Sequence, residues 1–209
     1  MDASVPSILS LADWRRSVAE LYASIRVDTD PRAAWERWRA ARRDLFRSHA
    51  QSPIPIAERD TYAGPFVFPF EPSARAVATL EPLDGGPVDV GTSDGLVTRM
   101  LRFARARFEL FGQQASLDVF WFDQYGGGIY VAFRDATSGT DTYGGGRYLL
   151  DTVKGADLGV ESNRLILDFN YAYQPSCSYD PRWSCPLPPP ENTLDVEVTV
   201  GERLSEPVG

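Results

Sequence analysis

The chain has 209 residues, of which 43% are hydrophobic and 24% are charged, and its formal net charge is −8. These values exclude a mostly disordered chain and a fibrous repeat. The length fits one domain with an appendage, and no apolar run approaches the roughly 18 residues of a membrane-crossing helix. The start shows no basic segment followed by an apolar one, so we expect a cytoplasmic protein with no membrane partner.

The negative charge is concentrated after residue 50. Residues 1–50 contain nine arginines against seven acidic residues, and the rest of the chain is strongly acidic. An acidic body repels phosphate backbones, so we expect no nucleic-acid partner. The charges of residues 1–50 alternate in sign, which is typical of solvated helix faces.

Two helices are predicted at the start of the chain. Apolar residues recur at three- and four-residue steps from Leu11 to Ile25, and a second helix begins at Asp30-Pro31 and includes Trp35 and Trp38. The two tryptophans are expected to pack against the rest of the protein. We therefore expect residues 1–52 to form a helical appendage and residues 53–209 an antiparallel β domain, the two making one structural unit.

From residue 66 onward the apolar pattern has the two-residue period of strands. The clearest segments are 104–110, 117–121 and 129–133, and short turns join them, which permits only antiparallel neighbours. Further strands are predicted at 164–169 and 194–200, with others near 66–70, 74–80 and 88–90. The predicted fold is therefore mainly β within the α+β class: an antiparallel, barrel-like or strongly bent sheet with two N-terminal helices.

The residue inventory excludes several chemistries. One histidine and two cysteines cannot complete a closed zinc site, and the only lysine, Lys154, does not belong to a phosphate-binding loop. The segment 91–95 matches the G-x-S-x-G pattern, but it lies among antiparallel strands and the histidine precedes the serine, so a surface turn is favoured. We expect no metal and no cofactor.

Residues 133–148 are short of apolar side chains and rich in hydrogen-bonding groups. The glycines at 144–146 allow backbone N–H groups to converge on an anion, and Arg147 can hold a carboxylate or phosphate. The alternative is a glycine-permitted bend in which Arg147 pairs with Asp135 or Asp168. The segment supplies the ligand-binding candidates Asp135, Thr137, Arg147 and Tyr148 and the catalytic candidate Tyr143.

A polar face ends the predicted strand 164–169. Asp168 and Asn170 share one side by alternation, opposite Leu167 and Phe169. If that side faces a barrel mouth, Asp168 is the best candidate for a carboxylate with a perturbed pKa and for acid–base catalysis. If it faces outward, both residues only begin the next loop.

Three further residues are possible site residues. Cys177 and Cys185 enclose seven residues, a loop short enough for a disulfide, whereas a reducing cytoplasm favours two free thiols. A cysteine nucleophile with His49 as its base is another alternative. His49 also lies just past a helix end, where an imidazole can satisfy carbonyl groups.

Several phrases together resemble the bacterial and archaeal family known as domain of unknown function 1684, over residues 45–203. These phrases are His49-Ala50-Gln51-Ser52-Pro53, Phe133-Arg134-Asp135-Ala136-Thr137-Ser138-Gly139, Thr142-Tyr143-Gly144-Gly145-Gly146-Arg147-Tyr148, Leu167-Asp168-Phe169-Asn170-Tyr171-Ala172-Tyr173 and Cys185-Pro186-Leu187-Pro188-Pro189-Pro190-Glu191-Asn192. The family has no assigned reaction, so the resemblance implies only that the polar phrases belong together around one site. Asn170, Glu191 and Asn192 complete the ligand-binding candidates.

The leading expectation is a protein that binds a small polar or anionic molecule at the mouth of the barrel. If it is an enzyme, Asp168 is the expected acid or base, Arg147 the anchor for substrate charge and Tyr143 the proton donor. The alternative is a structural or protein-interaction module, in which the polar phrases form a buried network and the helices with Trp35 and Trp38 dock a partner.

Overall fold

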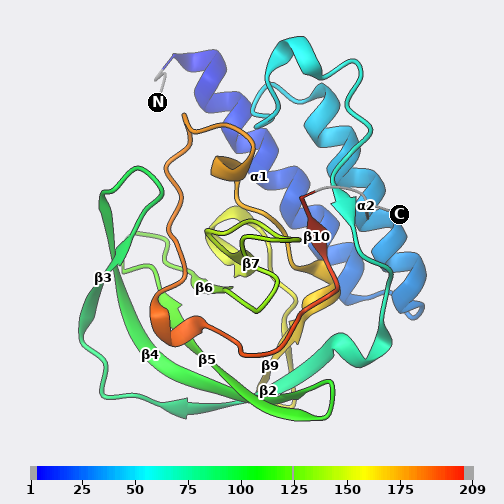
Figure 1. Ribbon diagram of the computed structural model, residues 1–209. Helices are drawn as coiled ribbons and strands as arrows, with labels where there is room; N and C mark the ends of the chain where they lie inside the picture. The colour runs from blue at the N-terminus through cyan, green and yellow to red at the C-terminus, as the bar shows by residue number, and fades with distance from the viewer. Residues whose placement is uncertain (1–3, 124, 205–209) are drawn as a thin grey trace.

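The computed structural model describes residues 4–123 and 125–204. The helices α1 (Val5–Arg26) and α2 (Pro31–Ser48) lie side by side on one side of a curled sheet (Figure 1). Helix α2 begins where the sequence predicts, because the Asp30 side chain accepts hydrogen bonds from the amides of Arg32 and Ala33 and Pro31 follows the cap.

The sheet is antiparallel throughout. Its strands are, in spatial order, β7 (Arg147–Asp151), β6 (Ile129–Phe133), β5 (Gln113–Trp121), β4 (Val97–Leu110), β2 (Arg75–Pro82), β9 (Arg164–Asp168) and β8 (Val160–Glu161). Strand β3 (Pro87–Gly91) pairs with the first part of β4, and β1 (Phe66–Val67) pairs separately with β10 (Glu202–Arg203). Short turns join neighbours, such as the left-handed pair Phe111-Gly112 between β4 and β5.

Two irregularities curl the sheet into a half-barrel. The pairing of β4 with β5 shifts between Arg102 and Ala104, and the pairing of β6 with β7 shifts between Val131 and Ala132. An extra residue in one strand bends that strand and increases its twist. The prediction of a mainly β fold with a strongly bent antiparallel sheet and two N-terminal helices is therefore confirmed.

The larger hydrophobic core lies between the helices and the sheet. Tyr22, Trp35 and Trp38 from the helices join Phe108 of β4 and Phe169 of the 3-10 turn after β9 in one buried cluster. A smaller cluster, which contains Met100, Phe120, Tyr130, Tyr148 and Cys185, is built from β4 to β7 and the segment around Cys185. Both tryptophans of α2 are buried, as the sequence indicated.

The predicted strand at 194–200 is wrong, although its side chains do alternate. Leu194, Val198 and Val200 are buried and the residues between them are more exposed, yet no strand forms there. Its first part makes only isolated backbone bonds, from Leu194 to Arg134 and from Ala136 to Val196, and its last part bonds to side chains: Arg147 donates to the carbonyls of Val198 and Val200, and Asp135 accepts from the amide of Val198. The segment is extended without a partner strand.

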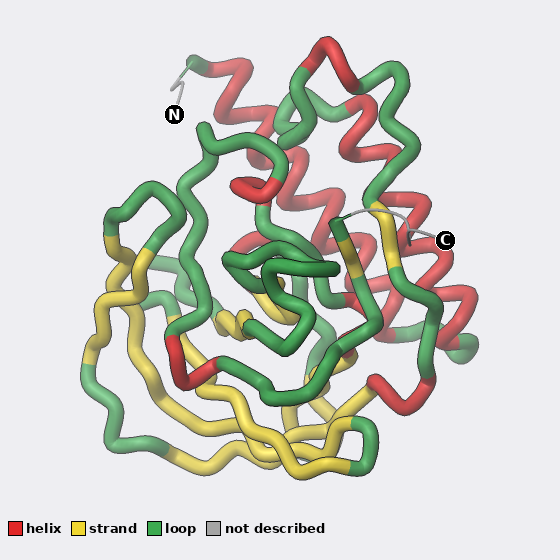
Figure 2. The backbone as a smooth tube through the Cα atoms, viewed as in Figure 1, coloured by secondary structure: helices red, strands yellow, loops and turns green. Residues whose placement is uncertain are grey.

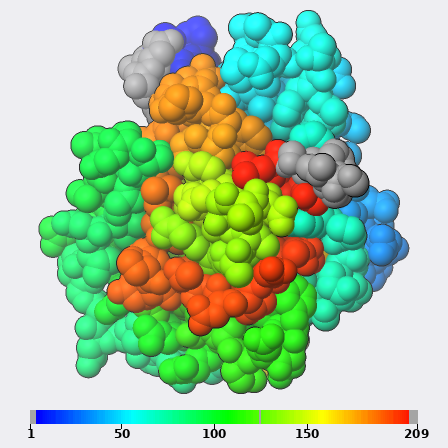
Figure 3. Space-filling view, in the orientation of Figure 1, coloured from blue at the N-terminus to red at the C-terminus, as the bar shows by residue number. Residues whose placement is uncertain are grey.

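Much of the chain after Asp168 is loop (Figure 2). In Figure 3 the yellow-green atoms of the 134–146 loop fill a ring made by the orange and red atoms of the C-terminal segment. Backbone hydrogen bonds join the two, from Arg134 to Asn192, from Ala136 to Val196 and from Leu204 to Asp141. No helix within the described residues has the length and apolarity required to cross a bilayer.

Candidate functional site

Arg147 lies in a buried polar network instead of an open anion site. Its guanidinium donates to the carbonyls of Val198, Val200 and Glu202, and it pairs with Asp135 at 3.4 Å, with both side chains almost fully buried. Burial lowers the pKa of Arg147, and the Asp135 carboxylate opposes that shift. These contacts favour the expected alternative in which Arg147 pairs with Asp135 and has a structural role.

Two neighbours complete this network. The Thr137 hydroxyl donates to Asp135 at 2.8 Å and lies 3.0 Å from the hydroxyl of Thr142. The glycine run makes a turn in which the amide of Gly146 donates to the carbonyl of Tyr143. That amide is therefore already occupied and does not point at an external anion.

Asp168 lies apart from Arg147, in a cavity that we call the Asp168 cavity. It is lined by Ile25, Arg26, Asp28, Arg75, Asp168 and Tyr171, among others. One Asp168 oxygen accepts hydrogen bonds from the backbone and the side-chain amide of Asn170. Burial raises the pKa of Asp168 above its usual value, and Asn170 and Arg75 reduce that shift.

Asn170 and Asn192 act as braces between distant segments. Asn170 exchanges two hydrogen bonds with the backbone of Glu71, and Asn192 donates to the carbonyls of Asp118 and Ala132 and accepts from the amide of Asp118. Both amides are buried and fully engaged in these bonds. Glu191 is exposed beside Asn192, 3.9 Å from Arg102.

His49 occupies the end of α2. Its amide donates to the carbonyl of Leu45, its Nδ1 accepts from the amide of Gln51, and its Nε2 lies 3.3 Å from Asp13. The ring packs edge-on against Trp14, with 5.1 Å between centroids. His49 therefore lies at the helix end, as the sequence indicated, but its ring contacts are with the Gln51 amide and Asp13 and not with helix carbonyls.

Four candidates gather on the side of β7 that faces the proline-rich segment. The thiol of Cys177 lies 3.9 Å from the Tyr143 hydroxyl, and Cys177 and Cys185, both free thiols, lie close to each other. The Tyr148 hydroxyl donates to the carbonyl of Pro186. Burial raises the pKa of Tyr143 to about 12, so its hydroxyl remains a proton donor at neutral pH.

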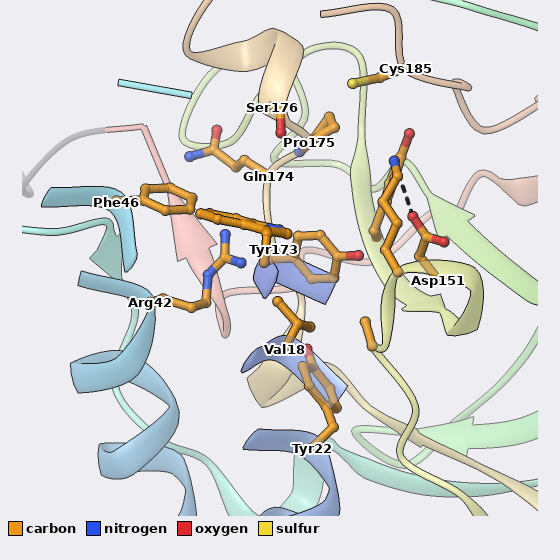
Figure 4. A pocket seen from close by; sticks show the side chains of 14 residues that line it. Val18, Tyr22, Arg42, Phe46, Asp151, Tyr173, Gln174, Pro175, Ser176 and Cys185 are labelled. Atoms are coloured by element: carbon orange, nitrogen blue, oxygen red, sulfur yellow. Dashed lines mark ion pairs between the residues drawn. The ribbon is translucent and has the colours of Figure 1, made fainter. Parts of the chain in front are cut away.

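Tyr148 and Cys185 also line a second cavity, which lies between the two helices and the segment 173–176 and which we call the helix–sheet cavity. Its cavity volume is about 60 Å³, and it opens to solvent. Figure 4 shows Arg42 and Phe46 on one side, Asp151 and Cys185 on the other, and Tyr173 between them. Gln174 and Ser176 also line it, and it shares no lining residue with the Asp168 cavity.

Two ion pairs border the helix–sheet cavity. Lys154 lies 3.3 Å from Asp151, and Arg42 makes a two-pronged pair with Glu202. The cations are the exposed members: the side chain of Lys154 is 49% exposed and that of Arg42 12%, against 3% for Asp151 and 0% for Glu202. The accessible charge in this cavity is therefore positive.

Sequence reasoning missed Asp151, Lys154 and Arg42 as site residues. The available signal was that Lys154 is the only lysine in the chain, but no motif surrounds it. Nowhere in the described part of the chain do three His, Cys, Asp or Glu side chains gather as a metal site would require.

Comparisons with known proteins agree with the resemblance seen in the sequence. A solution NMR structure of an uncharacterised protein from Haloarcula marismortui is 37% identical in sequence, with 83% of this chain and 96% of that chain covered and a TM-score of 0.57. No curated protein matches. A family model described as "Protein of unknown function (DUF1684)" matches residues 60–203, and this chain therefore belongs to that family.

Proposed function

We propose that this protein binds a small organic anion in the helix–sheet cavity. The observation that carries the proposal is the half-exposed side chain of Lys154 at the edge of an aromatic cavity, paired with the buried carboxylate of Asp151. The proposal keeps the expected ligand class but moves the site away from the barrel mouth, because the 134–146 loop fills that position.

Lys154 has hydrogen-bonding capacity left for an anion. Its ammonium group has three donors, and Asp151 takes one of them. The Asp151 carboxylate raises the pKa of Lys154, which keeps the side chain charged at neutral pH. A carboxylate or phosphate can therefore bind without displacing Asp151.

The walls of the cavity indicate what the uncharged part of the ligand is like. Trp14, Phe46, Tyr148 and Tyr173 supply aromatic surface, and Arg42 is held between rings, 4.8 Å from the centroids of Phe46 and Tyr173. Apolar walls with a few placed polar groups are typical of small-molecule sites. The ligand class is thus a small carboxylate or similar anion with a flat or apolar body.

A thermal-shift titration tests this proposal. Benzoate, its neutral amide benzamide and the cation benzylamine have similar rings and differ in charge. We expect benzoate to raise the melting temperature, and Lys154→Gln to weaken its binding about tenfold. Val18→Phe fills the cavity and should abolish binding, whereas Ala12→Phe, on an exposed part of α1, should not. Absence of benzoate binding, or equal binding of all three probes, would contradict the proposal.

Acid–base chemistry at Asp168 is a second candidate function. It is favoured by one observation, a buried carboxylate with a raised pKa lining a cavity that also contains Arg26 and Arg75. The test is to titrate both the unsubstituted protein and the Asp168→Asn variant with small carboxylates. The affinity of a ligand that contacts Asp168 should change between pH 4 and pH 7 only in the unsubstituted protein.

The alternative function, a protein-interaction module whose helices dock a partner, required exposed tryptophans on those helices. Trp35 and Trp38 are buried in the core, so they provide no docking surface. The buried polar network that this alternative also expected is present around Arg147, where it serves the fold.

A further inference from the structure

The pair of free thiols, Cys177 and Cys185, is a second feature of the molecule that could support a reaction. Cys177 belongs to the 3-10 turn Ser176–Ser178 and is partly exposed, whereas Cys185 is buried. Cys185 belongs to the cluster that contains Tyr130 and Tyr148, Cys177 packs against that cluster, and the two thiols lie close together. Two neighbouring thiols, one partly exposed and one buried, have the arrangement of a nucleophilic and a resolving thiol.

Backbone contacts fix the position of Cys185, and prolines flank both cysteines. Ser93 accepts a hydrogen bond from the amide of Cys185 at 3.1 Å, and the carbonyl of Cys185 accepts one from the amide of Ser93 at 2.9 Å. Pro175 precedes the turn that carries Cys177, and Pro186 follows Cys185. Prolines restrict the backbone on both sides, so the thiols meet without a large entropic cost.

Three polar side chains lie around the sulfur of Cys177. The Cys177 thiol donates to the Tyr143 hydroxyl at 3.9 Å, and the proximity of Cys185, Ser93 and Tyr143 lowers the pKa of Cys177 to about 6. The pKa of Cys185 is raised by its contact with Cys177 and by burial. The other titratable or charged groups near the pair are Tyr130, Tyr148, Lys154 and, next to Tyr143, Arg134.

We propose that Cys177 and Cys185 form a redox-active dithiol that exchanges with low-molecular-weight disulfides. The Cys177 thiolate attacks one sulfur of the disulfide, a mixed disulfide forms on Cys177, and the other half leaves as a thiolate. Cys185 then loses its proton and attacks the Cys177 sulfur. The products are the Cys177–Cys185 disulfide and a second small thiolate, so two electrons pass from the protein to the small disulfide.

Cys185 also lines the helix–sheet cavity, but the thiol reaction requires no ligand there, so it is tested in the absence of benzoate. The test uses the full chain and glutathione disulfide as the probe, with free thiols alkylated and the products measured by intact mass spectrometry. We expect the unsubstituted protein to lose both thiols with no retained glutathione, and Cys185→Ser to retain one glutathione on Cys177. Cys177→Ser should remain unmodified at neutral pH.

The pH dependence separates this reaction from the background reactivity of thiols. A low pKa gives more thiolate but a weaker nucleophile, so at pH 5.5 Cys177 should react on the order of tenfold faster than free N-acetylcysteine, and near pH 8.5 the advantage should disappear. Cys185→Ser keeps a hydroxyl donor to Cys177 and Cys185→Ala does not, so only the alanine variant should move the rate profile towards higher pH.

Two results would overturn the proposal. One is alkylation of Cys177 with the pH profile of an ordinary thiol in the folded protein. The other is a stable glutathione adduct on the unsubstituted chain, which would show that Cys185 does not resolve it. Circular dichroism of each variant establishes that the chain is folded when these results are obtained.

Discussion

Arg147 and Asp135 are buried charges: apart from Asp135, the Arg147 guanidinium donates only to backbone carbonyls in the described residues, whereas Asp135 accepts from both side chains and amides. Replacing Arg147 by Met should lower the free energy of unfolding by about 3–5 kcal/mol, because it leaves a buried carboxylate and three carbonyls without their donor. Urea denaturation measures the loss. The control is Arg107→Ala, which breaks an exposed pair with Glu81 and should cost at most about 1 kcal/mol. Equal effects of the two substitutions would contradict a structural role for Arg147.

Asp168 gives a prediction about pH. Burial raises its pKa above the usual 3.8, so the folded state binds this proton more tightly than the unfolded state. The stability that the group contributes is full below about pH 3.8 and is lost as the pH rises through the folded-state pKa. Asp168→Asn should therefore be more stable than the unsubstituted protein at pH 7 and equally stable near pH 3.5, by urea denaturation. Asp89→Asn, on an exposed position of β3, serves as the control and should change little. A less stable Asp168→Asn variant at pH 7 would contradict this cause of the shift.

The type of each candidate residue was predictable, but its partner was not. The sequence allowed Arg147 either an external anion or a carboxylate, and the choice depends on carbonyls about fifty residues further along the chain. Lys154 shows the opposite case: no local pattern marks it, and its position at a cavity comes from the docking of the helices. The chemistry of a side chain can be read from the sequence, whereas which distant groups surround that side chain is decided by the tertiary structure.

The contact of helix α1 with the turn after β7 depends on one glycine. Gly155 has a φ of +91°, and a Cβ atom there would lie 2.7 Å from the backbone nitrogen of Ala19. Gly155→Ala should therefore cost the strain of a left-handed residue, about 1–2 kcal/mol, and a steric clash in addition. Gly95 has a similar φ of +82° but open space around it, so Gly95→Ala isolates the strain. Thermal denaturation should show a clearly larger loss for Gly155→Ala, and equal losses would mean that α1 moves aside freely.

At the scale of elements, alternation predicted strands where neighbouring strands pair with them. Residues 104–110, 117–121, 129–133 and 164–168 lie in β4, β5, β6 and β9, joined in part by short turns. The same alternation at 194–200 predicts burial correctly but not strand pairing, because Arg147 and Asp135 take the hydrogen bonds of Val198 and Val200 that a neighbouring strand would otherwise make. An alternating pattern of buried side chains therefore predicts which residues are buried. Whether the segment becomes a strand depends on backbone hydrogen bonds with a neighbouring strand.

At the scale of the whole molecule, the bent antiparallel sheet was predictable because short turns join segments with the two-residue period of strands. The position of the helices was not, since any apolar stripe on α1 and α2 can cover several faces of a sheet. Two kinds of contact determine it: aromatic packing, as between Trp38 and Tyr171, and the buried pair of Arg42 with Glu202. The helix–sheet cavity exists only because of this placement.

These contacts lead to a prediction about residues 1–52, the expected helical appendage. Tyr22, Trp35 and Trp38 belong to the same buried cluster as the sheet, so removing the helices exposes that face and leaves Glu202 without Arg42. Calorimetry of the full chain should show one transition with equal calorimetric and van't Hoff enthalpies. Residues 53–209 alone should lack the near-ultraviolet circular dichroism of fixed tertiary packing, and adding a peptide of residues 1–52 should restore it. A native-like spectrum of residues 53–209 without the peptide would show instead that the β domain is independent of its helices.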